Sequence, residues 1–151
     1  MNTTPLQDLA KSLHNCQRCK LAKLGRTQVV FGVGNPHASI MFVGEAPGFN
    51  EDQKGEPFVG AAGKLLNDLL ASANLSRDQI YIANVIKCRP PNNRDPEADE
   101  VETCKPFLLQ QIQMIRPKLV CTLGNWATQT LLDRKSTRLN SSHTVISYAV
   151  F

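Results

Sequence analysis

The sequence predicts an α/β fold, a three-layer α/β/α sandwich around a mainly parallel central sheet. Apolar runs of strand length alternate along the chain with segments in which leucine recurs at helical spacing. Clusters of glycine, proline and asparagine separate these segments, as is typical of turns. Because open α/β sheets bind ligands beyond the carboxyl ends of their strands, we expect the functional residues in the loops that follow the strands.

The individual elements follow from local patterns. A capping-box spacing from Thr4 to Gln7 opens a helix whose leucines recur every three or four residues. Asp95 and Pro96 open another helix, as an acidic N-cap followed by proline at the first helical position. In all, helices are expected at about residues 5–14, 64–70, 95–114 and 126–132, and strands at about residues 28–31, 39–43, 79–86 and 118–123.

Length and charge limit the class of protein. With 151 residues, 42% of them hydrophobic, the chain has room for one domain with a single core. It has no apolar run near the roughly 18 residues of a membrane span and no secretory signal pattern, so we expect a cytoplasmic monomer without a membrane partner. The net charge of +4 is concentrated in residues 134–151, since residues 1–133 hold 14 basic and 13 acidic residues. Charge alone therefore does not indicate a nucleic-acid partner.

Four of the five cysteines form a pattern typical of a metal site. Cys16 and Cys19 are separated by two residues, and Cys88 and Cys104 supply a second, more widely spaced pair. Four thiolates suit either a structural zinc ion or an iron–sulfur cluster, and the spacing leaves both open. Cys121 lies in a predicted apolar strand, where a free cysteine behaves as a small hydrophobe, so we place it outside the site.

Four sequence blocks occur in a fixed order along residues 6–133. They are Cys-x2-Cys at residues 16–19, GEAPGFNEDQKGEPFVGAAGKLL at 44–66, NVIKCRPPNNRDP at 84–96 and ETCKPFL at 102–108. Taken together they resemble the family 4 uracil-DNA glycosylases, which carry a [4Fe–4S] cluster. The resemblance implies that the protein hydrolyses the N-glycosidic bond of deoxyuridine in DNA, the first step of base-excision repair. It also implies that Cys16, Cys19, Cys88 and Cys104 hold the cluster as a structural staple.

Two side chains are expected to recognise the base. The ring of Phe58 would stack on a flipped uracil, while Asn84 would accept from uracil N3–H and donate to O4, which cytosine cannot satisfy. The alternatives are an ordinary core phenylalanine and an asparagine that bonds backbone at the end of a strand. The expected substrate-binding residues are Gly44, Glu45, Ala46, Pro47, Gly48, Phe58 and Asn84.

The catalytic residues are expected to be Asn84 and Glu45. In the wider superfamily the loop after this strand often bears an aspartate that activates water, but the matching position here is Ala46. Water would then be handled by Asn84 or by backbone groups, with Glu45 helping to position the base. Glu51 and Asp52 are predicted to be an exposed acidic pair with no role in the site.

The resemblance ends near Asp133. The family continues with another strand and a His-Pro-Ser loop, whereas residues 134–151 look like a non-native read-through tail in which Thr-Val follows His143. We therefore expect a glycosylase-like domain over residues 1–133 that is incomplete at its C-terminus, with an open sheet edge beside residues 118–123. Low stability and weak or absent excision are the expected consequences.

Two other classes of protein remain open on the sequence alone. A non-enzymatic nucleic-acid-binding module, stapled by zinc or by an iron–sulfur cluster, needs the four thiolates but gives the loop at residues 44–63 no chemistry. An iron–sulfur electron carrier is less favoured, because ligands spread over about 90 residues are more typical of a staple.

Overall fold

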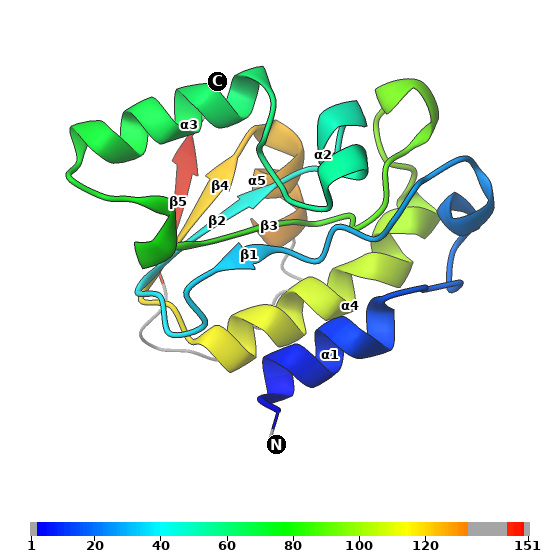
Figure 1. The fold of residues 1–151 in the computed structure, drawn as a ribbon, viewed down its shortest axis with the longest axis horizontal. Coiled ribbons are helices and arrows are strands. Elements are labelled where there is room, and N and C mark those ends of the chain that lie inside the picture. Colours follow the sequence, from blue (N-terminus) through cyan, green and yellow to red (C-terminus); the bar gives the residue numbers. More distant parts are fainter. Residues whose placement is uncertain (1–2, 133–144, 150–151) are drawn as a thin grey trace.

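The protein is described by a computed structural model that covers residues 3–132 and 145–149. Its sheet has five strands in the order β1-β3-β2-β4-β5 (Figure 1). The strands are β1 (Val33–Gly34), β2 (Ile40–Gly44), β3 (Tyr81–Asn84), β4 (Leu119–Leu123) and β5 (Val145–Ala149). All neighbouring pairs are parallel except β1 and β3, which are antiparallel. The predicted α/β fold with a mainly parallel sheet is confirmed.

Helices cover both faces of this sheet. They are α1 (Pro5–Leu13), α2 (Phe49–Lys54), α3 (Ala61–Ser72), α4 (Ala98–Ile115) and α5 (Asn125–Leu132), with short 3₁₀ turns η1 (Lys20–Lys23), η2 (Arg77–Gln79) and η3 (Pro91–Asn93). Figure 1 shows α3 above the sheet and α1 and α4 below it. The capping box at Thr4 opens α1 as predicted. The short helix α2 was not predicted, because FNEDQK has no apolar periodicity.

The strands separate two hydrophobic clusters because successive side chains of a strand point to opposite faces. Met41 and Val43 of β2 belong to the cluster that includes buried residues of α4 and α5. Ile40 and Phe42 instead pack against the cluster that contains Leu66 and Leu70 of α3. Helices therefore pack against both faces of the sheet, which gives the predicted three-layer α/β/α sandwich.

The first and third strands differ from their predicted bounds. A strand was expected at residues 28–31, but only Val33 and Gly34 pair with β3. The preceding segment is extended, and the amide of its buried Val30 donates to the carbonyl of Lys87. β3 ends at Asn84, because the chain then turns and the amide of Val85 donates to Gly44.

The edge of the sheet beside β4 is occupied. β5 pairs with β4 in parallel register, from Leu119 opposite Val145 to Leu123 opposite Ala149. The prediction that this edge is open is therefore wrong. The domain boundary predicted after residue 133 lies outside the part of the chain that the structure describes, and so does His143. What the sequence indicates about both therefore stays a prediction. No helix in the described residues is long and apolar enough to cross a membrane.

Candidate active site and cysteine cavity

A pocket lies at the carboxyl ends of β2 and β3. Gly44 and Asn84 are the last residues of these neighbouring parallel strands and stand opposite each other in the register. Gly44 lies two residues after Phe42, and Asn84 lies two residues after Ile82, so both are on the face of the sheet that α3 covers. The pocket is open to solvent, and it is lined by Ala46, Glu51, Phe58, Ala62 and Asn84.

Gly44 is required for the close approach of the two base-recognition side chains. A Cβ atom on Gly44 would lie 2.5 Å from Asn84 Oδ1 and 2.6 Å from Phe58 Cζ. Any side chain at this position would fill the space between the amide and the ring. The structure thus brings together the three residues that the sequence predicted for base recognition.

Asn84 carries the clearest chemical feature of the pocket. Its side chain is 2% exposed, and its Oδ1 has no hydrogen-bond partner among the described residues. A buried acceptor without a donor costs about 1–3 kcal/mol, so an orphan of this kind requires an explanation. The alternative in which this oxygen bonds backbone is not found. The backbone carbonyl of Asn84 accepts from Lys87 Nζ at 2.7 Å, and burial lowers the pKa of Lys87 to about 8.

Phe58 is held in a left-handed conformation, with φ of 55°. Such a conformation costs about 1–3 kcal/mol in a residue other than glycine and persists only where its surroundings enforce it. The guanidinium of Arg77 donates to the carbonyls of Pro57, at 3.2 Å, and of Phe58. Gly63 lies against the same carbonyl, and a Cβ on Gly63 would come within 2.0 Å of Phe58 O. Phe58 also packs against the hydrophobic cluster that contains Leu66 and Leu70 of α3. The residue therefore contacts the core and lines the pocket at the same time.

The carboxylate of Glu51 ties the two loops of the pocket together. One oxygen accepts from the amide of Gly48 at 3.0 Å, and the other accepts from the amides of Val59 at 2.9 Å and Gly60 at 3.0 Å. The same residue lines the pocket. Glu51 is therefore a site residue that the sequence interpretation missed, although an acid three positions into a helix after a glycine is a recognisable capping pattern.

Asp52 is buried rather than solvated. Its side chain is 1% exposed, and its two oxygens accept from the amide of Thr27 at 2.9 and 3.1 Å. This contact fixes α2 against the segment that carries Arg26. The prediction that Glu51 and Asp52 form an exposed acidic pair is wrong, because both carboxylates bond backbone amides of distant segments.

The other residues of the loop after β2 divide between the pocket and its surroundings. Ala46 lines the pocket, Pro47 is buried beside it, and Gly48 precedes the first residue of α2. Glu45 is not among the lining residues. Burial raises the pKa of the Glu45 carboxyl, and the charge of nearby Asp95 and a hydrogen bond with it raise that pKa further. The structure therefore places Glu45 against a second acid.

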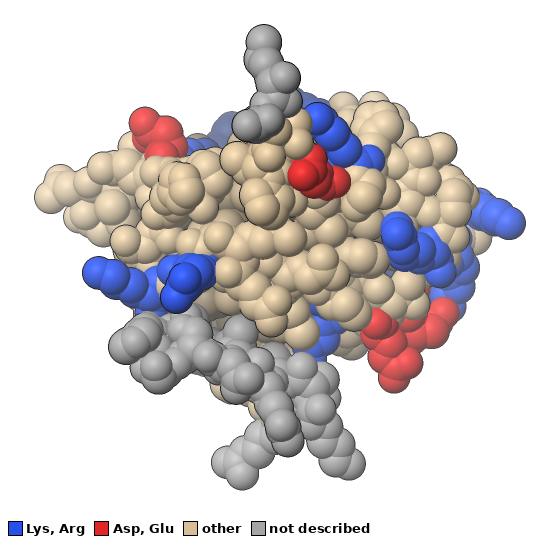
Figure 2. All heavy atoms as spheres, turned by 90° about the horizontal axis from the view of Figure 1, so that it is seen from below, with Lys and Arg blue, Asp and Glu red and all other residues tan. Residues whose placement is uncertain are grey.

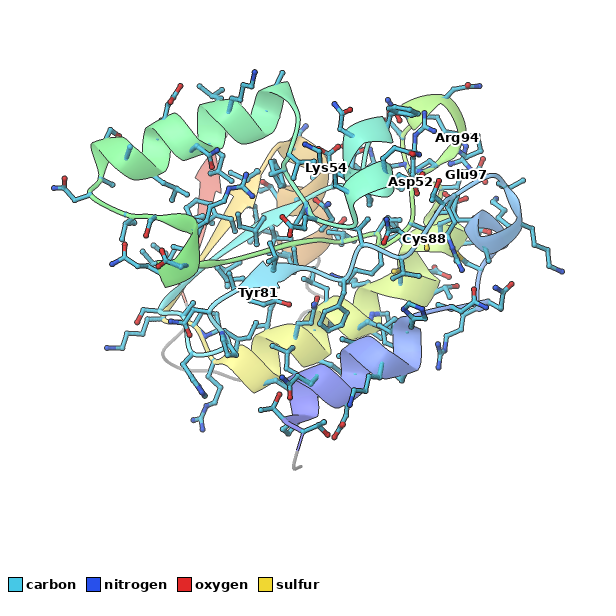
Figure 3. All side chains as sticks on the ribbon, viewed as in Figure 1. Asp52, Lys54, Tyr81, Cys88, Arg94 and Glu97 are labelled. Carbon is cyan, nitrogen blue, oxygen red and sulfur yellow. The ribbon has the colours of Figure 1, made fainter. Side chains whose placement is uncertain are left out.

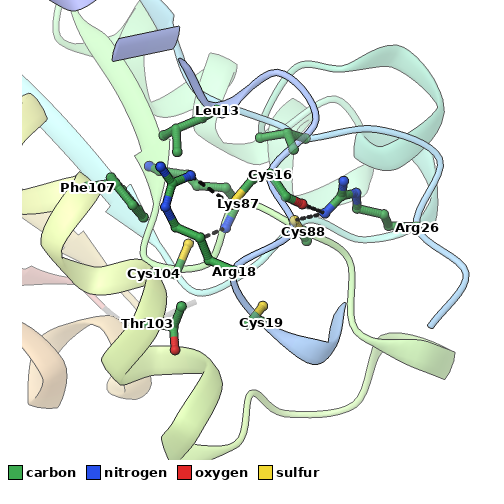
Figure 4. Close-up of a pocket in the computed structure, with 11 residues that line it drawn as sticks. Leu13, Cys16, Arg18, Cys19, Arg26, Lys87, Cys88, Thr103, Cys104 and Phe107 are labelled. Carbon is green, nitrogen blue, oxygen red and sulfur yellow. Dashed lines mark hydrogen bonds between the residues drawn. The ribbon is translucent and has the colours of Figure 1, made fainter. Parts of the chain in front are cut away.

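The four predicted ligand cysteines line one cavity on the opposite face of the sheet (Figure 4). Leu13, Val29 and Phe107 are among its walls. Cys16 follows the end of α1, Cys19 precedes η1, Cys88 follows β3 and Cys104 lies within α4. Cys121 lies in β4, outside the cavity, as predicted.

Cationic and amide donors face three of the sulfur atoms. Arg18 Nη1 lies 3.4 Å from Cys16 Sγ, Arg26 Nη1 lies 3.3 Å from Cys88 Sγ, and the Lys87 amide lies 3.3 Å from Cys104 Sγ. Burial raises the pKa of Cys88 to about 12, although the positive charge of Arg26 acts to lower it. Burial also raises the pKa of Cys104. The thiols of Cys88 and Cys104 are therefore protonated at neutral pH unless a bound metal replaces their protons.

The four thiols around the cavity are ligands of the kind that either a structural zinc ion or an iron–sulfur cluster takes. No group of three His, Cys, Asp or Glu side chains at the spacing of a single metal ion is found in the described residues.

Charge is distributed without a basic stripe on the side of α1 and α4. Figure 2, which views the molecule from that side, shows lysine and arginine in separate groups at the margins of a largely uncharged face. Asp52, Arg94 and Cys88 lie instead at the end of the sheet where β2 and β3 finish (Figure 3). The side chain of Arg94 forms a two-point ion pair with buried Glu100, at 2.9 and 2.7 Å.

The sequence is similar to those of known proteins. Residues 31–149 match the uracil DNA glycosylase superfamily, and the chain belongs to it. Within it, the chain is 53% identical to the type-4 uracil-DNA glycosylase of Archaeoglobus fulgidus over 128 residues, which are 85% of the chain and 64% of that protein. Type-4 uracil-DNA glycosylases of Sulfurisphaera tokodaii and Saccharolobus solfataricus are each 50% identical, over 90% and 88% of the chain. The chain spans 62–64% of the length of these three relatives.

Proposed function

We propose that the protein is a uracil-DNA glycosylase that hydrolyses the N-glycosidic bond of deoxyuridine in DNA. The observation that carries the proposal is the unpaired, buried Oδ1 of Asn84, which stands beside the ring of Phe58 over Gly44. An enzyme that acts on a base must hold it outside the stack, read its edge by hydrogen bonds and cover its face. The type-4 relatives support uracil as that base.

The residues of the pocket divide this work. Asn84 Oδ1 accepts from uracil N3–H and its amide nitrogen donates to O4, while the ring of Phe58 covers the base. Cytosine carries an acceptor at N3 and a donor at C4, so it would leave the buried oxygen unpaired, at a cost of about 1–3 kcal/mol. Glu51 keeps the two loops at the spacing that the base requires.

Cleavage of the glycosidic bond leaves negative charge on the uracil, and fixed donors around the base lower the barrier by stabilising that charge. In this chain Asn84 supplies one such donor at O4. Glu45 serves as a positioning group in the loop beside the pocket, because its carboxyl faces Asp95 rather than the pocket. The attacking water is held by backbone groups of residues 44–48, because both polar atoms of the Asn84 amide bind the edge of the base.

Cys16, Cys19, Cys88 and Cys104 are proposed to hold a [4Fe–4S] cluster. When bound, it supplies a structural link and no redox step. Its ligands would join the segment after α1 to α4 and to the loop after β3. Because Asn84 ends β3 four residues before Cys88, such a link also fixes the strand end that carries the base-reading amide.

Uracil release under single-turnover conditions tests the proposal. The purified chain, in excess over a single-stranded oligonucleotide with one deoxyuridine, is expected to release uracil, and a matched deoxycytidine oligonucleotide should stay intact. Excess protein makes even slow release measurable. Absence of release, together with equal affinity for the two oligonucleotides, would contradict the assignment. Iron content and visible absorbance separate this proposal from a zinc-stapled binding module, and a lack of reversible reduction separates it from an electron carrier.

A further inference from the structure

Phe49 is an exposed aromatic residue beside the pocket. It is the first residue of α2 and directly follows the loop at residues 44–48. Its side chain is 55% exposed, and the guanidinium carbon of Arg89 lies 5.3 Å from the centre of its ring. Scattered exposed apolar residues are common in proteins and need no explanation. An exposed ring that is already paired with an arginine is a more specific feature, because both groups stack on planar partners.

The two residues come from neighbouring loops at the same end of the sheet. Phe49 lies in the segment that follows β2, and Arg89 lies in the segment that follows β3 and leads into η3. Figure 1 shows α2 and the η3 loop side by side at this end, and the contact between Phe49 and Arg89 joins them. Asn84, the last residue of β3, lines the pocket, and Gly44, the last residue of β2, lies beside it. The Phe49–Arg89 pair therefore lies on the two segments that follow the strands of the pocket.

The direction of Phe49 places it beside the pocket and not in it. Glu51, two residues further along α2, lines the pocket. Residues two apart in a helix project about 200° from each other, so Phe49 points away from the pocket wall that Glu51 forms. A nucleotide next to the flipped base, and not the flipped base itself, is the part of a DNA strand that such a side chain meets.

Arg89 is held against Phe49 by a second contact. Its Nε donates to Oδ1 of Asn93 at 2.7 Å, which fixes the plane of the guanidinium over the ring of Phe49. The other two cation–aromatic pairs in the described residues differ in their setting. Arg18 lies over Phe107 at the cysteine cavity, and Lys87, which lies near Phe31, is buried.

We propose that Phe49 and Arg89 form a stacking shelf for the base that flanks the uracil in the same DNA strand, an inference that rests on the proposed function. When a base leaves the stack, its neighbour loses a stacking partner, and an aromatic ring replaces it irrespective of sequence because every base has a π-face. The positive charge of Arg89 adds attraction for the phosphate between the two nucleotides. The shelf thereby offsets part of the cost of removing the uracil from the stack.

A fluorescent base analogue tests the shelf directly. Single-stranded oligonucleotides carry 2-aminopurine on one side or the other of a single deoxyuridine, and binding by the intact chain is followed through quenching of the analogue. Quenching is expected on one side. Phe49→Ala and Phe49→Leu should each lose it and weaken binding roughly 5- to 150-fold, whereas Phe49→Tyr should keep both. Leu69→Ala, which truncates a similarly exposed residue of α3, is the matched control and should bind like the unaltered chain.

The outcomes separate the shelf from the proposed function. If the chain prefers deoxyuridine to deoxycytidine but Phe49→Leu quenches and binds as the unaltered chain does, the shelf is wrong and the glycosylase assignment stands. If the chain shows no preference for deoxyuridine, the proposed function is wrong whatever Phe49 does. Retained helical circular dichroism shows that a variant is folded, and Phe49→Tyr provides a second, conservative comparison.

Discussion

Replacement of Asn84 by alanine should separate stability from base recognition. In the free protein, Asn84 Oδ1 is buried without a partner among the described residues, which costs about 1–3 kcal/mol. Asn84→Ala removes that cost and loses contacts of a small side chain, worth about 1 kcal/mol. We expect the free energy of unfolding to stay unchanged or to rise by up to about 2 kcal/mol. For a chain of this length each kcal/mol corresponds to about 3 °C in Tm.

The same substitution should strongly impair uracil binding. Two hydrogen bonds to the base edge are lost, which together are worth about 2–3 kcal/mol, or roughly 30- to 150-fold in affinity. Thermal denaturation followed by circular dichroism measures the first effect, and fluorescence anisotropy with a deoxyuridine oligonucleotide measures the second. A fall in Tm of more than about 3 °C with unchanged affinity would refute the reasoning, because Asn84 would then be a structural cap.

An aspartate at the same position provides the matched variant. Asn84→Asp keeps an acceptor but loses the donor to uracil O4, and its acceptor-only edge suits the exocyclic amine of cytosine. We expect the preference to shift from deoxyuridine towards deoxycytidine. The variant should also be less stable than the unaltered chain, because a carboxylate replaces an amide that is 2% exposed.

Three further predictions concern the surroundings of the pocket and the cavity. Glu51→Ala should lower the free energy of unfolding by about 2–3 kcal/mol, because three amides lose their acceptor, and Glu51→Gln should lower it less. Equal stability of the two variants and the unaltered chain in urea denaturation would contradict this. The pKa of Glu45 is raised on folding, so the folded state binds its proton more tightly, and the resulting stability is lost as pH rises from about 4.5 through the raised pKa. Glu45→Gln should therefore gain Tm relative to the unaltered chain above that window, and parallel Tm curves between about pH 4 and pH 8 would count against the burial of Glu45. Cys88→Ser should lose bound iron and its visible absorbance, whereas Cys121→Ser should retain both; iron loss in the Cys121 variant instead would show that the ligand set is misassigned.

The sequence was sufficient for the features that depend on local pattern. Strand-length apolar runs predicted β2 and β4, the capping box at Thr4 predicted α1, and residues at the strand ends predicted the meeting of Gly44 with Asn84. These features repeat at fixed periods or follow directly from a parallel sheet. The spacing of the cysteines also predicted that four of them form one site, and the structure places those four around one cavity. The family-specific order of motifs was needed only to favour an iron–sulfur cluster over zinc.

Features that depend on contacts between distant segments could not be predicted. Asp52 is buried because it bonds the amide of Thr27, 25 residues earlier, and nothing in the local sequence of either residue indicates that contact. Glu45 faces Asp95 because the η3 loop returns past the end of β2. β5 occupies the edge of the sheet beside β4, a pairing between distant segments that no local pattern indicates.

The affinity of the purified chain for two oligonucleotides tests the central claim most directly. Each is single-stranded and differs only in one central base, deoxyuridine or deoxycytidine, and each is measured against the unaltered chain and Asn84→Ala. The account predicts roughly 5- to 150-fold tighter binding of deoxyuridine by the unaltered chain, from one buried acceptor satisfied or left unpaired, and no such difference in the variant. Equal affinities for both oligonucleotides in the unaltered chain would contradict it.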